Sequence, residues 1–268
     1  MDKAVVLARG LGTRMKRADD ETILSDAERE AADTGVKGLI PIDRPFLDYL
    51  LSALADAGYR RVCLVVAPDH DAIRSYYRRV PLRRIAIDFA VQVEPKGTAD
   101  AVAAAAPFVG EDDFLVINSD NYYPGEALRG LRDSDGFATA LFERESMLQG
   151  SNIPAERIGM FAVARLGSGD VLERIIEKPD EATLAVIPKP LWLSMNCWRF
   201  TPAVFEACRR IRPSPRGELE LPDAVQYVID VLRRPFHAVM VRAPVLDLTS
   251  RRDVATIKPK LAGIRVEL

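Results

Sequence analysis

Short apolar runs alternate with segments of helical periodicity along the first half of the chain. The pattern predicts strands at residues 3–8, 61–67, 85–92 and 114–118, separated by helices at residues 45–57, 69–79 and 98–107. This alternation is typical of βαβ units that build a largely parallel sheet with helices on both faces. Ligands bind such sheets at the carboxyl ends of the strands, so we expect the functional site in the loops that follow them.

Beyond about residue 135 the predicted strands follow one another at shorter intervals. They cover residues 136–142, 158–165, 171–177, 191–200 and 236–242, and helices are predicted from Thr201-Pro202, over residues 221–232 and after Ser250. No linker rich in Gly, Ser or Pro separates this part from the first. We therefore expect a single α/β domain over residues 1–268, with residues 1–134 and 135–268 as its two halves.

Residues 16–36 form an acidic segment rich in Ala and Glu. Ser25 followed by Glu28 is a capping-box pattern, which predicts a short helix over residues 26–32. Two interpretations stay open for this segment. It is either a lid over a bound ligand or a solvated insertion at the surface.

Composition narrows the class of protein. The chain has 48% hydrophobic residues, enough for a full core, and 37 Lys and Arg against 39 Asp and Glu. The basic residues occur as scattered pairs, so a nucleic-acid groove is not indicated. No apolar run approaches membrane-spanning length, so no membrane partner is expected. We expect no signal peptide or membrane anchor. Three widely spaced cysteines, Cys63, Cys197 and Cys208, lie in apolar stretches and are typical of reduced, buried residues in a cytoplasmic protein.

The first strand leads into the glycine-bearing loop Leu7-Ala8-Arg9-Gly10-Leu11-Gly12-Thr13-Arg14. A dinucleotide-binding fingerprint needs a third glycine where this chain has Met15, and the Gly-Lys-Ser/Thr of a P-loop is absent. Glycines at positions 10 and 12 still allow the backbone to approach a polyanion, to which Arg14 adds a charged fork. The loop is therefore interpreted as a phosphate cradle, with a plain tight turn as the alternative.

Four further polar residues lie beside predicted strands or apolar runs. Lys37 precedes an apolar run and is suited to neutralise phosphate oxygens. Gln92 ends a strand and offers an amide to a nucleobase edge, or is simply an exposed strand end. Asp120 follows a buried strand, and Asp247 follows a late one. Two such carboxylates suit Mg²⁺, although Asp247 alone could equally cap the last helix.

Taken in order, these motifs resemble those of the sugar-1-phosphate nucleotidylyltransferases, above all their hexose-1-phosphate thymidylyl-, uridylyl- and guanylyltransferase branch. The matching segments are residues 7–15, 37–41, 92–101, 119–121, 177–179 and 247. The resemblance implies a Rossmann-like three-layer α/β/α sandwich with a mixed, mostly parallel central sheet. It also implies a Mg²⁺-dependent reaction in which a sugar phosphate oxygen attacks the α-phosphorus of a nucleoside triphosphate (NTP) and releases pyrophosphate.

The resemblance assigns a role to each matching residue. The implied nucleotide-binding residues are Leu7, Ala8, Gly10, Gly12, Thr13, Arg14, Gln92, Gly97 and Thr98. The implied catalytic residues are Arg14, Lys37 and Lys178, and the implied Mg²⁺ ligands are Asp120 and Asp247. The implied sugar-binding residues are Asn121, Gly159, Glu177, Lys178 and Asn196. The expected partners are an NTP and a small phosphorylated substrate; a homo-oligomer is left open.

Some residues depart from the family pattern. Arg9 replaces a small residue, Ile158 replaces an aromatic before Gly159, and residues 194–198 lack the usual glycine. The nucleobase and the sugar therefore stay undetermined. Two other functions stay open: a nucleotide-sugar-dependent glycosyltransferase, which would need an Asp-x-Asp motif where Asp120 begins Asp-Asn-Tyr, and a nucleotide-sensing protein without turnover.

Overall fold

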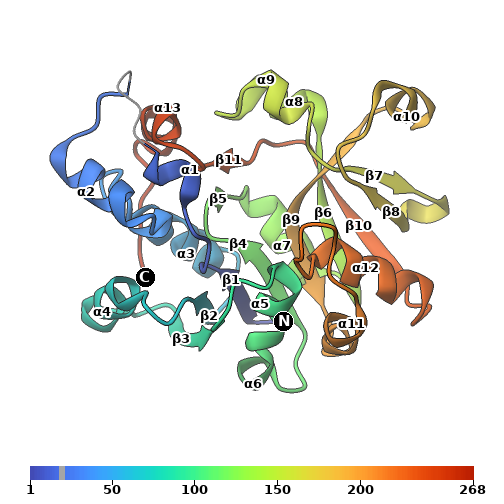
Figure 1. Ribbon diagram of the computed structural model, residues 1–268, viewed down its shortest axis with the longest axis horizontal. Helices are drawn as coiled ribbons and strands as arrows, with labels where there is room; N and C mark the ends of the chain where they lie inside the picture. Colours follow the sequence, from blue (N-terminus) through green and yellow to red (C-terminus); the bar gives the residue numbers. More distant parts are fainter. Residues whose placement is uncertain (18–21) are drawn as a thin grey trace.

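A computed structural model of the protein describes residues 1–17 and 22–268 (Figure 1). Within these residues nine strands form one mixed sheet with the order β10-β6-β9-β4-β1-β2-β3; β7 joins this row by pairing with β9, and β8 pairs with β7. β1 pairs in parallel with β2 and β4, and β2 in parallel with β3. β9 runs antiparallel to β4 and β6, while β6 and β10 are parallel. The predicted fold class is confirmed.

The strands of the large sheet are β1 (Lys3–Leu7), β2 (Arg61–Val66), β3 (Ala86–Val91), β4 (Phe114–Asn118), β6 (Phe137–Glu143), β7 (Val163–Leu166), β8 (Leu172–Ile176), β9 (Trp192–Phe200) and β10 (Phe236–Val241). A second, two-stranded sheet pairs β5 (Asn121–Tyr122) with β11 (Leu246–Asp247) in antiparallel orientation.

The first helices along the chain are α1 (Thr13–Lys16), α2 (Asp26–Thr34), the 3-10 helix η1 (Lys37–Leu39), α3 (Phe46–Asp56), α4 (Asp71–Arg79), α5 (Thr98–Ala104), α6 (Ala106–Val109) and α7 (Gly125–Asp133). The later ones are α8 (Arg144–Gly150), α9 (Ala155–Ile158), η2 (Ser168–Asp170), α10 (Glu181–Val186), α11 (Val204–Arg210), α12 (Leu221–Asp230) and α13 (Arg251–Leu261).

Helices cover the sheet on both faces because its central strands are apolar on both sides. Along β1, Ala4 and Val6 join one buried cluster while Val5 joins the other. The first cluster is closed by α3, α4 and α7, and the second by α5, α11 and α12. A strand that is buried on both faces has a continuous apolar sequence, and this is the pattern from which the strand was predicted.

One predicted strand is wrong. Residues 158–165 were expected to be extended, but Ile158 ends helix α9 and β7 begins only at Val163. Ile158 is fully buried, and the N–H of Gly159 donates to the carbonyl of Ala155 as a helix cap. A short apolar run fits a buried helix end as well as a strand, and its packing decides between them.

Helix α2 is attached to the C-terminal helix. The Ser25–Glu28 capping box is present as predicted. Apolar side chains of the two helices share a third buried cluster, and Lys258 and Arg251 of α13 form ion pairs with Glu28 and Asp33 of α2. In the described part of the insertion, α2 is therefore docked on α13, while residues 18–21 lie outside the described residues and the lid interpretation is not decided for them.

No helix in residues 1–17 and 22–268 has both the length and the apolar character needed to span a bilayer.

Arg199 of β9 connects three parts of the sheet from a buried position. Its guanidinium bonds Asp113 at 2.8 Å and donates to the carbonyls of Gly136, Leu131 and Arg132 at 3.1, 3.2 and 3.0 Å. These groups lie in the segments that lead into β4 and β6. Because Arg199 satisfies several polar atoms at once, its removal leaves a carboxylate and buried carbonyls without partners.

We expect Arg199→Met to lower the free energy of unfolding by about 3 kcal/mol, since it breaks a largely buried ion pair. Arg165, whose exposed guanidinium pairs with Glu173 at 3.0 Å, supplies the control. Arg165→Met should cost at most about 1 kcal/mol. Urea unfolding of the three proteins measures the difference, and equal costs for the two variants would refute the role given to Arg199.

Candidate functional site

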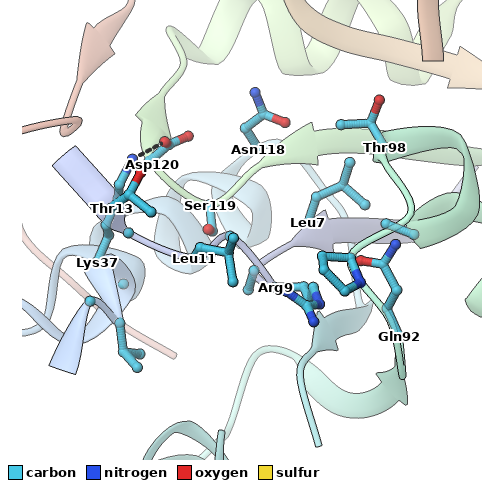
Figure 2. Close-up of a pocket in the computed structure, with 18 of the residues that line it drawn as sticks. Leu7, Arg9, Leu11, Thr13, Lys37, Gln92, Thr98, Asn118, Ser119 and Asp120 are labelled. Carbon is cyan, nitrogen blue, oxygen red and sulfur yellow. Dashed lines mark hydrogen bonds and ion pairs between the residues drawn. The ribbon is translucent and has the colours of Figure 1, made fainter. Parts of the chain in front are cut away.

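A cavity of about 350 Å³ opens at the carboxyl ends of β1, β3 and β4 (Figure 2). Among the residues that line it are Leu7, Ala8, Gly10, Gly12, Thr13, Arg14, Lys37, Gln92, Gly97, Thr98 and Asp120. Every residue predicted to bind a nucleotide is in this set. The lining also includes Arg9, which the family pattern did not place in the site.

The glycine loop has its shape because of Gly12. This residue has φ +62°, and a Cβ atom there would lie 2.2 Å from the carbonyl oxygen of Gly35. Gly10 has no atom within 4 Å of such a position, so its glycine leaves open space beside the loop. Arg14, in helix α1, is exposed and forms no hydrogen bond or ion pair with the described residues, so its donors are available to a ligand.

Lys37 and Asp120 meet at the opposite end of the cavity from Gln92 (Figure 2). The Lys37 Nζ atom lies 2.7 Å from Asp120 Oδ2. Asp120 follows β4, whose residue Asn118 pairs with Leu7 of β1. Parallel pairing of the two strands therefore brings the carboxylate beside the glycine loop.

Asp247 is brought to Asp120 by the small sheet. It pairs with Asn121 across β5 and β11, and the N–H of Leu248 donates to the carbonyl of Asp120 at 2.8 Å. The Asp247 carboxylate accepts hydrogen bonds from Asn121 Nδ2, at 3.1 Å, and from Arg157. Burial and the nearby Asp120 charge raise the pKa of Asp247, against the opposing effect of Arg157.

Asp120 and Asp247 offer carboxylate oxygens, the kind of ligand that a small divalent cation prefers. In residues 1–17 and 22–268, no group of three or more His, Cys, Asp or Glu side chains forms a complete metal cage. Two carboxylates that leave room for water and phosphate oxygens are the ligand set that Mg²⁺ uses at nucleotide sites. Here Lys37 and Arg157 compensate the two negative charges.

Arg157 was not identified from the sequence. It lies in α9, in the stretch just before the incorrectly predicted strand. Besides Asp247 it donates to Thr249 Oγ1 at 2.9 Å, and its second amino group lies 3.7 Å from Asp253. Its position depends on helix α9 meeting β11, a contact between distant segments that has no local sequence signal.

Gln92 is fixed in one orientation by its neighbours. Its side chain is 4% exposed, and Nε2 donates to the carbonyl of Gly97 at 3.0 Å and to Asp100 Oδ2 at 2.7 Å. Gly97 has φ +111°, and a Cβ there would lie 2.5 Å from the carbonyl of Leu219. Thr98 Oγ1 accepts a hydrogen bond from the N–H of Leu221 at 2.8 Å, so the turn is tied to the start of α12.

The residues assigned to the sugar are not among those that line the cavity. They are Asn121, Gly159, Glu177, Lys178 and Asn196. Asn196 has φ +53° within β9, and its Oδ1 accepts from Trp198 Nε1 at 3.4 Å. Lys178, just after β8, also has a positive φ of 45°. Reduced hydration and the carboxylate of Glu220 raise the pKa of Glu177.

The fold and this cavity define a nucleotide-binding α/β protein with paired carboxylates. Residues 33–241 match the family model described as nucleotidyl transferase. The chain therefore belongs to the nucleotidyl transferase family, and the resemblance found in the motifs is confirmed.

Individual relatives agree with this assignment. A glucose-1-phosphate thymidylyltransferase of Streptomyces griseus is 33% identical over 232 residues, which are 86% of this chain and 58% of the relative. The UTP-glucose-1-phosphate uridylyltransferase AglF of Haloferax volcanii is 29% identical over 231 residues, 85% of this chain and 83% of the relative. The chain thus spans a little more than half of the Streptomyces protein.

A solved structure shows the same fold. The structure is that of a UDP-glucose pyrophosphorylase complexed with UDP-glucose, which superposes with a TM-score of 0.74 at 18% identity and covers 99% of this chain and 100% of that chain.

The two loop glycines should respond differently to alanine. We expect Gly12→Ala to lower the free energy of unfolding by about 1–3 kcal/mol, because it combines a positive φ with a backbone clash. Gly10→Ala, with open space at its Cβ, should stay within about 0.5 kcal/mol of the parent chain. Thermal and urea unfolding measure both, and a Gly12→Ala protein as stable as Gly10→Ala would contradict the close approach to Gly35.

Proposed function

We propose that the protein is a Mg²⁺-dependent sugar-1-phosphate nucleotidylyltransferase, which joins an NTP and a sugar 1-phosphate to give a nucleotide-diphospho-sugar and pyrophosphate. One observation carries this proposal. A single cavity gathers an open glycine loop, an unpaired Arg14, Lys37 and Asp120, and the backbone of Asp120 accepts a hydrogen bond from Leu248, the residue after Asp247. The thymidylyl- and uridylyltransferase relatives support the same reaction.

The glycine loop would hold the triphosphate. Its backbone amides and the free guanidinium of Arg14 offer donors to phosphate oxygens, and Lys37 adds a compact positive charge. In such a transfer negative charge increases on the leaving pyrophosphate, so fixed cations beside it stabilise the transition state. Neither a covalent nucleophile nor a histidine is needed.

Asp120 and Asp247 would hold Mg²⁺. The cation, when bound, would offset charge on the two reacting phosphates and keep them close together. The neighbouring residues hold the two carboxylates in position. Asn121 and Arg157 hold the Asp247 carboxylate from the side, and the small sheet keeps it beside Asp120.

Base and sugar would lie on different sides of the phosphates. Gln92, Gly97 and Thr98 line the base end of the cavity. The sugar is assigned to Asn121, Gly159, Glu177, Lys178 and Asn196, of which all but Asn121 come from residues 135–268. We propose on this basis that residues 1–134 bind the nucleotide and residues 135–268 supply most of the sugar site within a single domain.

We infer a reducing compartment, the cytoplasm, from the cysteines. Cys63, Cys197 and Cys208 are all buried and free. Burial raises the pKa of the Cys63 and Cys208 thiols to about 12, so both stay protonated and unreactive.

The decisive test is a matrix of NTPs against sugar 1-phosphates with Mg²⁺, read by pyrophosphate release. We expect release from at least one pair. Asp120→Asn should reduce it at least about 100-fold with the fold intact, because a Mg²⁺ ligand is lost. Asp133→Asn, an exposed carboxylate paired with Arg132, is the control and should keep full activity.

Three results would count against the proposal. These are no pyrophosphate from any pair, sugar transfer to an acceptor without pyrophosphate release, and nucleotide binding without turnover. The second result would favour the glycosyltransferase and the third the nucleotide-sensing protein.

The dependence of the sugar-phosphate KM on pH should show whether Glu177 binds the sugar. If its carboxylate accepts hydrogen bonds from sugar hydroxyls, binding needs the ionised form, whose population falls as pH drops through the pKa. That pKa is raised, so the KM for the sugar phosphate should begin to rise at a higher pH than for an ordinary glutamate. Glu177→Gln should remove this part of the profile, whereas Glu181→Gln, in α10, should keep it. A profile unchanged by Glu177→Gln would exclude the role.

A further inference from the structure

Arg9 occupies the base end of the cavity without a partner among the described residues. Figure 2 shows Arg9 and Gln92 at one end, away from Lys37 and Asp120 at the other. The side chain is half-buried, and its Nε atom is buried without a hydrogen-bond partner. Among residues 1–17 and 22–268, none forms a hydrogen bond or an ion pair with Arg9.

A buried donor without a hydrogen-bond partner is costly, because it loses hydration and gains nothing in return, and the Nε atom of Arg9 is such a donor. The neighbouring titratable residue, His70, does not compensate the positive charge of Arg9. Burial, together with the positive charges of Arg9 and Arg74, lowers the pKa of His70, against an opposing effect of Asp69. An imidazole is neutral or positively charged, so His70 supplies no counter-charge to Arg9. The donors of Arg9 are thus left for a ligand.

Gln92 beside it can offer a ligand only an acceptor. Both groups that its Nε2 contacts, the carbonyl of Gly97 and the carboxylate of Asp100, accept hydrogen bonds and cannot donate them. The amide nitrogen must therefore face them. Its Oε1 atom receives no hydrogen bond from the described residues and remains for the ligand. Asp100 is in this way a positioning residue that sets the polarity of Gln92.

We infer that Arg9 reads the nucleobase, and that together with Gln92 it selects bases in which a carbonyl group stands beside a ring N–H. Arg9 donates to the carbonyl oxygen while Gln92 Oε1 accepts from the ring N–H. Uracil, thymine and guanine have this edge. Adenine has no carbonyl group, and cytosine has no ring N–H. The inference rests on the proposed binding of an NTP in this cavity.

A phosphate group is the competing ligand for Arg9. The position of Arg9 argues against it, because Lys37 and Asp120, which are expected to handle phosphate and metal, lie at the other end of the cavity (Figure 2). The two ligands also predict different dependences. If Arg9 contacts the base, Arg9→Ala should weaken the binding of a nucleoside triphosphate and of its monophosphate by the same factor. If Arg9 contacts the terminal phosphates, the variant should weaken the binding of the triphosphate only.

Calorimetric binding tests the inference without turnover or a known sugar. The probes are UTP, dTTP, GTP, ATP and CTP, together with the monophosphate of the tightest binder. The wild-type chain should bind at least one of UTP, dTTP and GTP about 10-fold or more tightly than ATP and CTP. Arg9→Ala should weaken that nucleotide and its monophosphate by the same factor, about 10-fold, and leave ATP unchanged.

Two further variants sharpen the test. Asp100→Asn lets the Gln92 amide turn over, so discrimination against ATP and CTP should fall. Arg78→Ala, an exposed change in α4 outside the cavity, should alter nothing. The melting temperature of Arg9→Ala should be unchanged or higher, because the variant removes an unsatisfied buried group.

Several outcomes would overturn the inference. The wild-type chain could bind ATP as tightly as the other nucleotides. Arg9→Ala could lower the affinity for all five NTPs equally, or for triphosphates only. It could also lower the melting temperature and leave nucleotide binding unchanged. Any of these leaves the proposed transferase intact so long as NTPs bind. Binding of no NTP at all would instead remove the proposed function itself.

Discussion

The cavity depends on the register that holds β1 between β2 and β4. Leu7, the last residue of β1, pairs with Val65 on one side and Asn118 on the other. Because all three strands are parallel, their chains leave the sheet at one edge, and the N–H of Ser119 still donates to the carbonyl of Leu7 at 3.2 Å. The adjoining strand β3 delivers Gln92 to the same edge. A slip of one residue would turn these side chains to the opposite face of the sheet.

Charge compensation is the second constraint on the site. Asp120 is paired with Lys37, and Asp247 with Arg157 and the amide of Asn121. Each buried or half-buried carboxylate thus has a cation within contact distance, as burial of charge requires. Arg9 and Arg14 have no such partner among the described residues, but Arg14 is exposed, whereas the Nε atom of Arg9 is buried.

Local patterns predicted most of this arrangement, and long-range contacts account for what they missed. The glycine loop, Gln92 and Asp120 stand at strand ends, so their common edge follows from the alternation of strands and helices. Arg157 of α9 reaches Asp247 of β11 across 90 residues of sequence, and no periodicity reports that contact. The predicted strand at residues 158–165 is a helix end followed by a later strand, and Ile158 at that helix end is buried in the first core cluster. The fixed polarity of Gln92 was likewise invisible without its neighbour Asp100.

The two-stranded sheet of β5 and β11 has a consequence for how the protein matures. It joins residues directly after β4 to residues close to the last helix, so it closes a very long loop of chain. Closure of such loops is entropically slow. The Asp247 carboxylate joins that of Asp120 only when residues 246–247 pair with residues 121–122. The acidic pair is therefore complete only after two distant segments have met, and a chain without β11 is left with half of it.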